Sequence, residues 1–419
     1  MFRTLTFLLA AFLTCGQAFA AQKIITFDDA LDAAARRRLV ESRGGSVVKD
    51  FAFIGAVLAD FSDASKAADI TRAPGVTAAE DDEEIYWLGS EDAPATLEAA
   101  AALAGDLLAG GTGLAEPPAA GVSVSTPAPV APVYVSTVNA EGKADRMPWS
   151  LARMRAPQAW ALTKGRGARV AVLDTGTDCS HPDLAAACAA GYNVFNPALP
   201  PADDKGHGTH VSGIIAGALN WKGMVGMAPE AAILPVKVLN SSGSGKVSEI
   251  IDGMDWAVRN KADIINMSLG AHKFSEAQGK AVKAARKAGV LVVCAAGNDG
   301  GAVNYPAAYP EALAVTALDY ASKLASFSSS GPETDFTAPG VRIFSAAPGG
   351  QFKLMNGTSQ AAPHISGLAA LAVSLGVKGP AALEAALVKA SFDLGLPAYH
   401  QGYGVPVADR LVKNITGRD

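Results

Sequence analysis

From residue 148 onward, short apolar runs alternate with stretches of helical periodicity. A continuous apolar run is typical of a strand buried on both faces, and its alternation with helices predicts a parallel sheet covered on both sides. We therefore expect an α/β domain whose functional residues lie at the carboxyl ends of its strands. The predicted strands are 169–173, 233–239, 263–267, 289–295 and 312–317, and the predicted helices are 207–219, 247–260, 275–288 and 358–374.

The pattern before this domain is different and more compact. Residues 22–88 predict the order β-α-β-β-α-β, which is that of a small ferredoxin-like α+β unit. Strands are predicted at 23–27, 46–53, 54–61 and 76–87, and helices at 28–43 and 62–71.

Two segments do not share these patterns. Residues 1–20 combine Arg3, an apolar run and a small-x-small end, which predicts a secretory signal peptide; the run is too short to span a bilayer. Residues 89–144 are rich in Ala, Gly and Pro and predict a linker, with a short helix at 96–109; a folded Ala-rich element is the alternative. The expected domains are thus 1–20, 21–88, 89–144 and 145–419.

Composition narrows the class of protein. Hydrophobic residues make up 49% of the 419 residues and charged residues 18%, which excludes a mainly disordered chain. The net charge of −5, without a basic stripe, makes nucleic acid an unexpected partner, and no later segment predicts a membrane span.

The cysteines depend on the compartment. Export to the periplasm or the medium would permit a disulfide between Cys179 and Cys188; two separate buried thiols are the alternative. Cys294 is expected to be an inert residue of the core.

Four side chains in short motifs are candidates for chemistry. Asp174 ends a predicted strand, His207 lies between glycines at a predicted helix start, Asn298 follows another strand, and Ser359 opens a long apolar helix. Taken alone, each could be purely structural. Asp174 and Asn298 could be ordinary turn residues, His207 could be a hydrogen-bonded structural histidine, and Ser359 could be a helix N-cap. His210, one turn beyond His207, is expected to be structural, and no ligand cluster supports a zinc site.

Together, three of these residues satisfy the needs of a hydroxyl nucleophile. An alcohol is a weak nucleophile at neutral pH, so it requires a nearby base, and the base requires an orienting carboxylate. Asp174, His207 and Ser359 occur in one of the three chain orders known for this triad, the order of subtilisin. Asn298 and the helix start at Ser359 offer N–H groups for an oxyanion.

With these motifs in place, residues 148–419 resemble the subtilisin-like serine peptidases, or subtilases. The resemblance is carried by Val-Leu-Asp-Thr-Gly at 172–176, His-Gly-Thr-His-Val-Ser-Gly at 207–213, and Gly-Thr-Ser through Ala-Pro-His at 357–364. It implies a self-processing endopeptidase that needs no catalytic cofactor, acts on protein or peptide substrates and is a monomer. Residues 22–88 resemble the family's propeptide, which implies an inhibitor of the chain's own active site and self-cleavage between Trp87 and Asp145.

The resemblance also implies secondary sites. Substrate backbone would pair with Gly243, Ser244 and Gly245 on one side and with Ser268, Leu269 and Gly270, a wall of the specificity pocket, on the other. A structural calcium ion is implied at Asp145, Asp183 and Asn220, for which solvated surface acids are the alternative.

The chain departs from the family pattern at three places. Gln360 replaces the usual Met, Lys205 replaces the usual Asn or Asp, and the connection from Asn298 to Tyr305 is short.

Two other functions compete with the endopeptidase. A catalytically inactive, secreted peptide-binding pseudoprotease would be expected to have lost part of the set at 174, 207, 298 and 359, and all four residues are present. An esterase would be expected to carry a Gly-x-Ser-x-Gly elbow, which Ser359 lacks.

Overall fold

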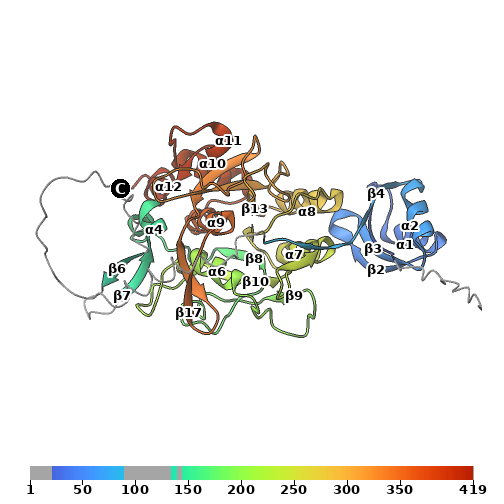
Figure 1. Ribbon diagram of the computed structural model, residues 1–419, viewed down its shortest axis with the longest axis horizontal. Coiled ribbons are helices and arrows are strands. Elements are labelled where there is room, and N and C mark those ends of the chain that lie inside the picture. Colours follow the sequence, from blue (N-terminus) through green and yellow to red (C-terminus); the bar gives the residue numbers. More distant parts are fainter. Residues whose placement is uncertain (1–20, 89–133, 139–143, 419) are drawn as a thin grey trace, which may run out of the picture. The chain divides into compact units, whose positions relative to one another are not determined.

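The computed structural model describes residues 21–88, 134–138 and 144–418, and Figure 1 shows its ribbon. The described residues divide into two compact units, the first ending at Glu83 and the second beginning at Glu84. The predicted signal peptide and the predicted helix at 96–109 lie outside the described residues.

The first unit is an antiparallel sheet with two short α-helices. Its strands have the spatial order β2-β3-β1-β4, and its apolar core includes Phe27, Val40 and Phe61. Both helices have an aspartate N-cap: Asp32 accepts from the N–H of Ala35, and Asp63 from that of Ser65. The elements follow the predicted order: β1 (Ala21–Phe27), α1 (Ala33–Ser42), β2 (Gly45–Phe51), β3 (Ala56–Phe61), α2 (Ala64–Asp69) and β4 (Val76–Asp81), with 3₁₀ turns η1 (Ala52–Ile54) and η2 (Ile70–Arg72).

The prediction of one strand over 76–87 is wrong. β4 ends at Asp81, and a separate strand, β5 (Glu84–Tyr86), pairs antiparallel with β11 (Ser244–Lys246) of the second unit. Apolar patterning indicates that a segment is extended, but it does not identify the partner to which the segment bonds.

The second unit is built on a parallel sheet of seven strands in the order β15-β14-β13-β12-β8-β10-β9. Its central strands β12 and β13 are buried throughout, and β8 is buried after its first residue, Arg169, as expected for strands covered on both faces. The strands are β8 (Arg169–Asp174), β9 (Tyr192–Asn193), β10 (Ala232–Lys237), β12 (Ile264–Met267), β13 (Leu291–Ala295), β14 (Leu313–Leu318) and β15 (Thr334–Pro339).

Helices cover both faces of this sheet (Figure 1). α6 (His207–Ala216) packs with α9 (Thr358–Ser374), and α7 (Val247–Arg259) packs with α8 (Glu276–Lys287). Val172 belongs to the same apolar core as Ile365 of α9. Leu173 faces the opposite way, because a Cβ at Gly253 of α7 would lie 3.5 Å from its side chain. The predicted doubly covered sheet is therefore confirmed.

Further elements complete the second unit, and one of them lies within the range predicted as a linker. Within the range predicted as a linker, residues 134–138 form the strand β6 (Tyr134–Val138), which pairs with β7 (Ala144–Pro148). No described helix is long and apolar enough to cross a membrane. The remaining elements are α4 (Trp149–Arg153), α5 (Ala156–Ala159), β16 (Ile343–Ala347), β17 (Gln351–Met355), α10 (Pro380–Ala390), β18 (Ser391–Phe392), α11 (Ala398–Gln401), β19 (Val405–Pro406) and α12 (Ala408–Thr416).

Candidate active site

The carboxyl edge of the parallel sheet gathers the candidate residues. Asp174 is the last residue of β8, Ser268 follows β12, and Asn298 lies three residues beyond the end of β13. β13, β12 and β8 are consecutive neighbours in the sheet and run parallel, so their carboxyl ends lie side by side.

Asp174 and His207 form a buried hydrogen-bonded pair. The Nδ1 atom of His207 lies 2.8 and 3.0 Å from the two carboxylate oxygens of Asp174, whose Oδ1 also accepts from the N–H of Thr175. The helix that carries His207 approaches β8 closely, and a Cβ at Gly208 would lie 2.0 Å from the carbonyl oxygen of Gly176. Glycine after the histidine is therefore a steric requirement of this pair.

Ser359 lies in the first turn of α9, directly after Thr358. Its hydroxyl donates to the carbonyl of Ser268 at 3.2 Å, and the Ser268 hydroxyl donates to the carbonyl of Ser359 at 2.8 Å. α9 packs against α6, the helix that begins at His207. For Ser359 to transfer its proton to His207, its hydroxyl must turn away from Ser268 about χ1; active-site hydrogen bonds of this kind commonly tighten only when substrate binds.

Asn298 is held by its side-chain oxygen. Its Oδ1 accepts from both the backbone N–H and the hydroxyl of Thr358, each at 2.8 Å. The Oδ1 of Asn298 is therefore fixed by its bonds to Thr358, and the NH₂ group of the same amide points away from Thr358. This is the orientation in which Asn298 can donate to an oxyanion formed at Ser359.

The six residues expected to bind substrate backbone flank an extended segment of the chain itself. The backbone N–H of Trp87 donates to the carbonyl of Gly243, and the N–H of Gly270 donates to the carbonyl of Trp87. The buried indole of Trp87 also donates to the carbonyl of Gly245 at 2.8 Å. Segment 84–88 thus lies between the edges that contain Gly243, Ser244 and Gly245 and Ser268, Leu269 and Gly270.

Other polar residues near the site are structural. His210 bonds to the carbonyls of Ile343 and Lys353, and burial lowers its pKa to about 3, so it is neutral. Burial raises the pKa of the Cys294 thiol, which keeps it protonated. Gln360 is fully buried, and no described residue bonds to its side-chain amide.

Asp203 also supports the site, although no role is predicted for it from the sequence. Its carboxylate accepts from the hydroxyl of Thr175 at 2.8 Å, from the N–H of Gly206 at 2.8 Å and from the N–H of Thr209 at 2.8 Å. Asp203 thereby joins the loop after Asp174 to the helix that begins at His207. Its signal was an aspartate just before a helix start, where carboxylates pair with unpaired N–H groups.

The three residues of the implied calcium site come together, but their oxygens accept protein donors. Asp145 accepts from the N–H groups of Trp221 and Gly223, and Asp183 accepts from that of Met224. Asn220 uses its Oδ1 for the N–H of Lys222. A calcium ion takes about six to eight oxygen ligands. Four of the five side-chain oxygens here accept N–H groups, and only the Oδ1 of Asp183 is buried without a partner among the described residues. The arrangement does not fit the ion, and the described residues contain no cluster of three or more potential acidic, His or Cys ligands.

Cys179 and Cys188 form a disulfide with an S–S distance of 2.03 Å. The disulfide closes part of the loop that follows Asp174. The backbone of Cys188 also pairs with that of Ile233 in β10, as a single β-bridge.

Comparison with known proteins agrees with this arrangement. The model of the subtilase family matches residues 165–405. Subtilisin from Bacillus pumilus is 45% identical over 237 residues, which are 55% of this chain and 86% of that protein. An intracellular serine protease from Paenibacillus polymyxa is 39% identical over 285 residues, 64% of this chain and 87% of that protein.

Subtilisin E from Bacillus subtilis (strain 168) is 44% identical over 237 residues, 55% of this chain and 62% of that protein. The family match covers more than half of the chain and contains Asp174, His207 and Ser359. The chain therefore belongs to the subtilase family and is a subtilisin-like serine endopeptidase.

Proposed function

We propose that this endopeptidase cleaves peptide bonds through Asp174, His207 and Ser359. The observation that carries the proposal is the buried bond between Asp174 and His207 beside the helix start at Ser359. Asp174 holds the Nδ1–H of His207, which leaves Nε2 as the proton acceptor. This is the tautomer that a serine nucleophile needs.

The reaction has two halves. Ser359 Oγ attacks the scissile carbonyl while His207 takes its proton, and the Asn298 amide and the Ser359 backbone N–H stabilise the oxyanion. His207 then protonates the leaving amine, so that an acyl-enzyme remains on Ser359. A water molecule, deprotonated by His207, attacks the acyl carbon. The bond to Ser359 Oγ then breaks, His207 returns the proton to that oxygen, and the acid is released.

We also propose that the protein is exported and made as a zymogen that inhibits itself. The backbone bonds of segment 84–88 with Gly243 and Gly270 support this, since a bound segment blocks a substrate that would use the same bonds. Cleavage between Trp87 and Asp145 would release the block. The Cys179–Cys188 disulfide and the signal-like residues 1–20 support export.

Substitution of the nucleophile tests the triad and the zymogen together. Ser359→Ala should fold, since the residue is small and, among the described residues, its hydroxyl bonds to Ser268 alone. It should lose roughly 10⁶-fold in kcat, the loss known for the nucleophile of subtilisin, a relative. Mass spectrometry of the purified variant should find it uncut between Trp87 and Asp145. Casein hydrolysis, fluorophosphonate labelling or normal processing by the variant would refute the assignment.

A further inference from the structure

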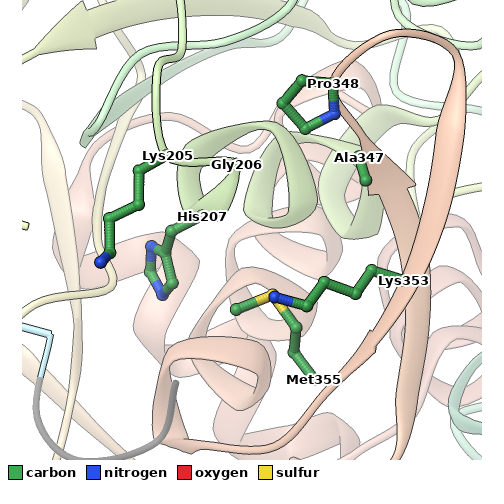
Figure 2. Close-up of a pocket in the computed structure, with 7 residues that line it drawn as sticks. All are labelled: Lys205, Gly206, His207, Ala347, Pro348, Lys353 and Met355. Atoms are coloured by element: carbon green, nitrogen blue, oxygen red, sulfur yellow. The ribbon is translucent and has the colours of Figure 1, made fainter. Parts of the chain in front are cut away.

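A cavity of about 310 Å³ lies beside His207. It opens between the start of α6 and the hairpin of β16 and β17 (Figure 2). Its lining residues are Lys205, Gly206, His207, Ala347, Pro348, Lys353 and Met355.

The direction of the bound segment shows which part of a substrate would reach this cavity. Glu84 pairs with Lys246, and Tyr86 pairs with Ser244. The N–H of Trp87 then donates to the carbonyl of Gly243. The segment therefore runs antiparallel to β11, and each later residue of the segment lies beside an earlier residue of the cleft edge. The next residue of that edge, Ser242, accepts a hydrogen bond from the ammonium of Lys205, which lines the cavity. A substrate bound in the same direction would pass from β11 toward the cavity. Because His207 lines the cavity and is the residue proposed to protonate the leaving amine, the cavity would receive the residues that follow the scissile bond.

The lining carries positive charge and no carboxylate. In the view of Figure 2, the side chains of Lys205 and Lys353 lie on opposite sides of His207, and that of Lys353 extends from β17 toward the His207 ring. Lys353 and Met355 are two residues apart on β17, so their side chains leave the strand on the same face. Lys353 is exposed, and no described carboxylate forms an ion pair with it.

Two acids, Asp203 and Asp204, directly precede Lys205 in the sequence. Asp203 accepts the backbone N–H groups of Lys205, Gly206 and Thr209. Asp204 pairs with Lys237 at 2.7 Å. Neither belongs to the cavity lining.

We propose that this cavity selects substrates with Asp or Glu among the first two residues after the scissile bond. The carboxylate would lie between Lys205 and Lys353, and the methylene groups of the acid would contact Met355 and Pro348. The cavity is large enough for side chains of any size, so charge rather than volume would decide the preference. The inference rests on the proposed peptidase function, because it names the substrates of that same site.

Matched peptides test the selection. Two fluorogenic peptides that differ only by Glu or Gln after the scissile bond are compared by kcat/KM at low ionic strength, with the cut site checked by mass spectrometry. The Glu peptide should be favoured by about threefold to tenfold, since each exposed ion pair contributes modestly. The preference should shrink as salt screens the lysines.

Variants of this chain assign the effect to the two lysines. Lys205→Gln and Lys353→Gln should each reduce the Glu/Gln ratio, the double variant should abolish it, and Lys353→Glu should favour a matched Lys peptide. Lys389→Gln, on α10, is the matched control that removes one exposed charge away from the cavity, and it should keep the wild-type ratio. Because each variant is judged by a ratio, a general loss of rate cancels.

Failure of this inference and failure of the proposed function are distinguishable. Equal cleavage of both peptides by the wild type, or a preference that survives in the double variant, would overturn the acidic selection while leaving the peptidase intact. Cleavage of neither peptide, together with no fluorophosphonate labelling of Ser359, would overturn the peptidase function itself and this inference with it.

Discussion

Asp174 and Asp145 are both completely buried carboxylates, but they differ in what they hold. Asp174 accepts from an imidazole N–H, which belongs to a ring that can gain and lose protons. Asp145 accepts from two backbone N–H groups of the loop at 220–224, which cannot change their protonation. Burial of an acid therefore does not by itself indicate chemistry; the donor decides whether the acid orients a base or fixes a loop.

The largest expected difference between the two acids is in the rate of peptide hydrolysis, which should depend on Asp174. Asp174→Asn should lower kcat by roughly 10⁴-fold, because an amide cannot stabilise the imidazolium and offers an N–H that favours the wrong tautomer of His207. Peptide hydrolysis gives the rate, and thermal unfolding should show a folded protein. Activity within tenfold of wild type would place His207 outside the catalytic apparatus.

Substitution of Asp145 should instead lower the stability of the folded protein. Asp145→Ala leaves the N–H groups of Trp221 and Gly223 without their carboxylate acceptor, which should reduce the free energy of unfolding by about 2–4 kcal/mol. Urea titration in the Ser359→Ala background avoids self-digestion. Glu333→Ala, an exposed acid, is the control and should change stability by less than about 0.5 kcal/mol. Unchanged stability of Asp145→Ala would contradict a structural role.

A smaller effect is expected from pH at Asp183. Burial raises the pKa of this carboxyl above its usual value, against the opposing bond from the N–H of Met224. The ionised form is therefore disfavoured in the folded state, and this destabilisation exists above the folded pKa and disappears as pH falls below it. Wild type should gain stability relative to Asp183→Asn as pH falls from 7 toward 4. The Tm difference between the two proteins measures this, and a difference that stays constant with pH would refute it.

The smallest effect is expected from removing calcium. Since the oxygens of Asp145, Asp183 and Asn220 mostly accept backbone N–H groups, EDTA should leave the Tm of the protein unchanged. A fall in Tm that added calcium restores would show that the loop rearranges around the ion, and the comparison between the two acids would need revision.

Much of the fold could be predicted from periodicity alone. The buried strands of the parallel sheet and the helix Thr358–Ser374 have continuous patterns, so their types followed directly from the sequence. The short strand Tyr192–Asn193 and the hairpin of β16 and β17 were not predicted, because segments this short carry too little pattern to separate from turns.

The candidate site could be predicted only in part. Motifs around Asp174, His207 and Ser359 are contiguous and recognisable, whereas Asp203 carries no motif and acts through bonds to Thr175 and Gly206. The cavity between Lys205 and Lys353 joins residues far apart in the chain, and no local pattern connects them.

The sequence by itself determined the element types, the order of the two units and the identity of the catalytic candidates, because these depend on local periodicity and on short motifs. Only the tertiary structure decided that segment 84–88 bonds to the cleft edges, that Asp145 holds a loop, and that two lysines face one cavity. The physical reason is that a hydrogen bond or a charge acts on whatever group folding brings within a few ångströms. That partner is fixed by the packing of remote segments, which is not encoded in either segment alone.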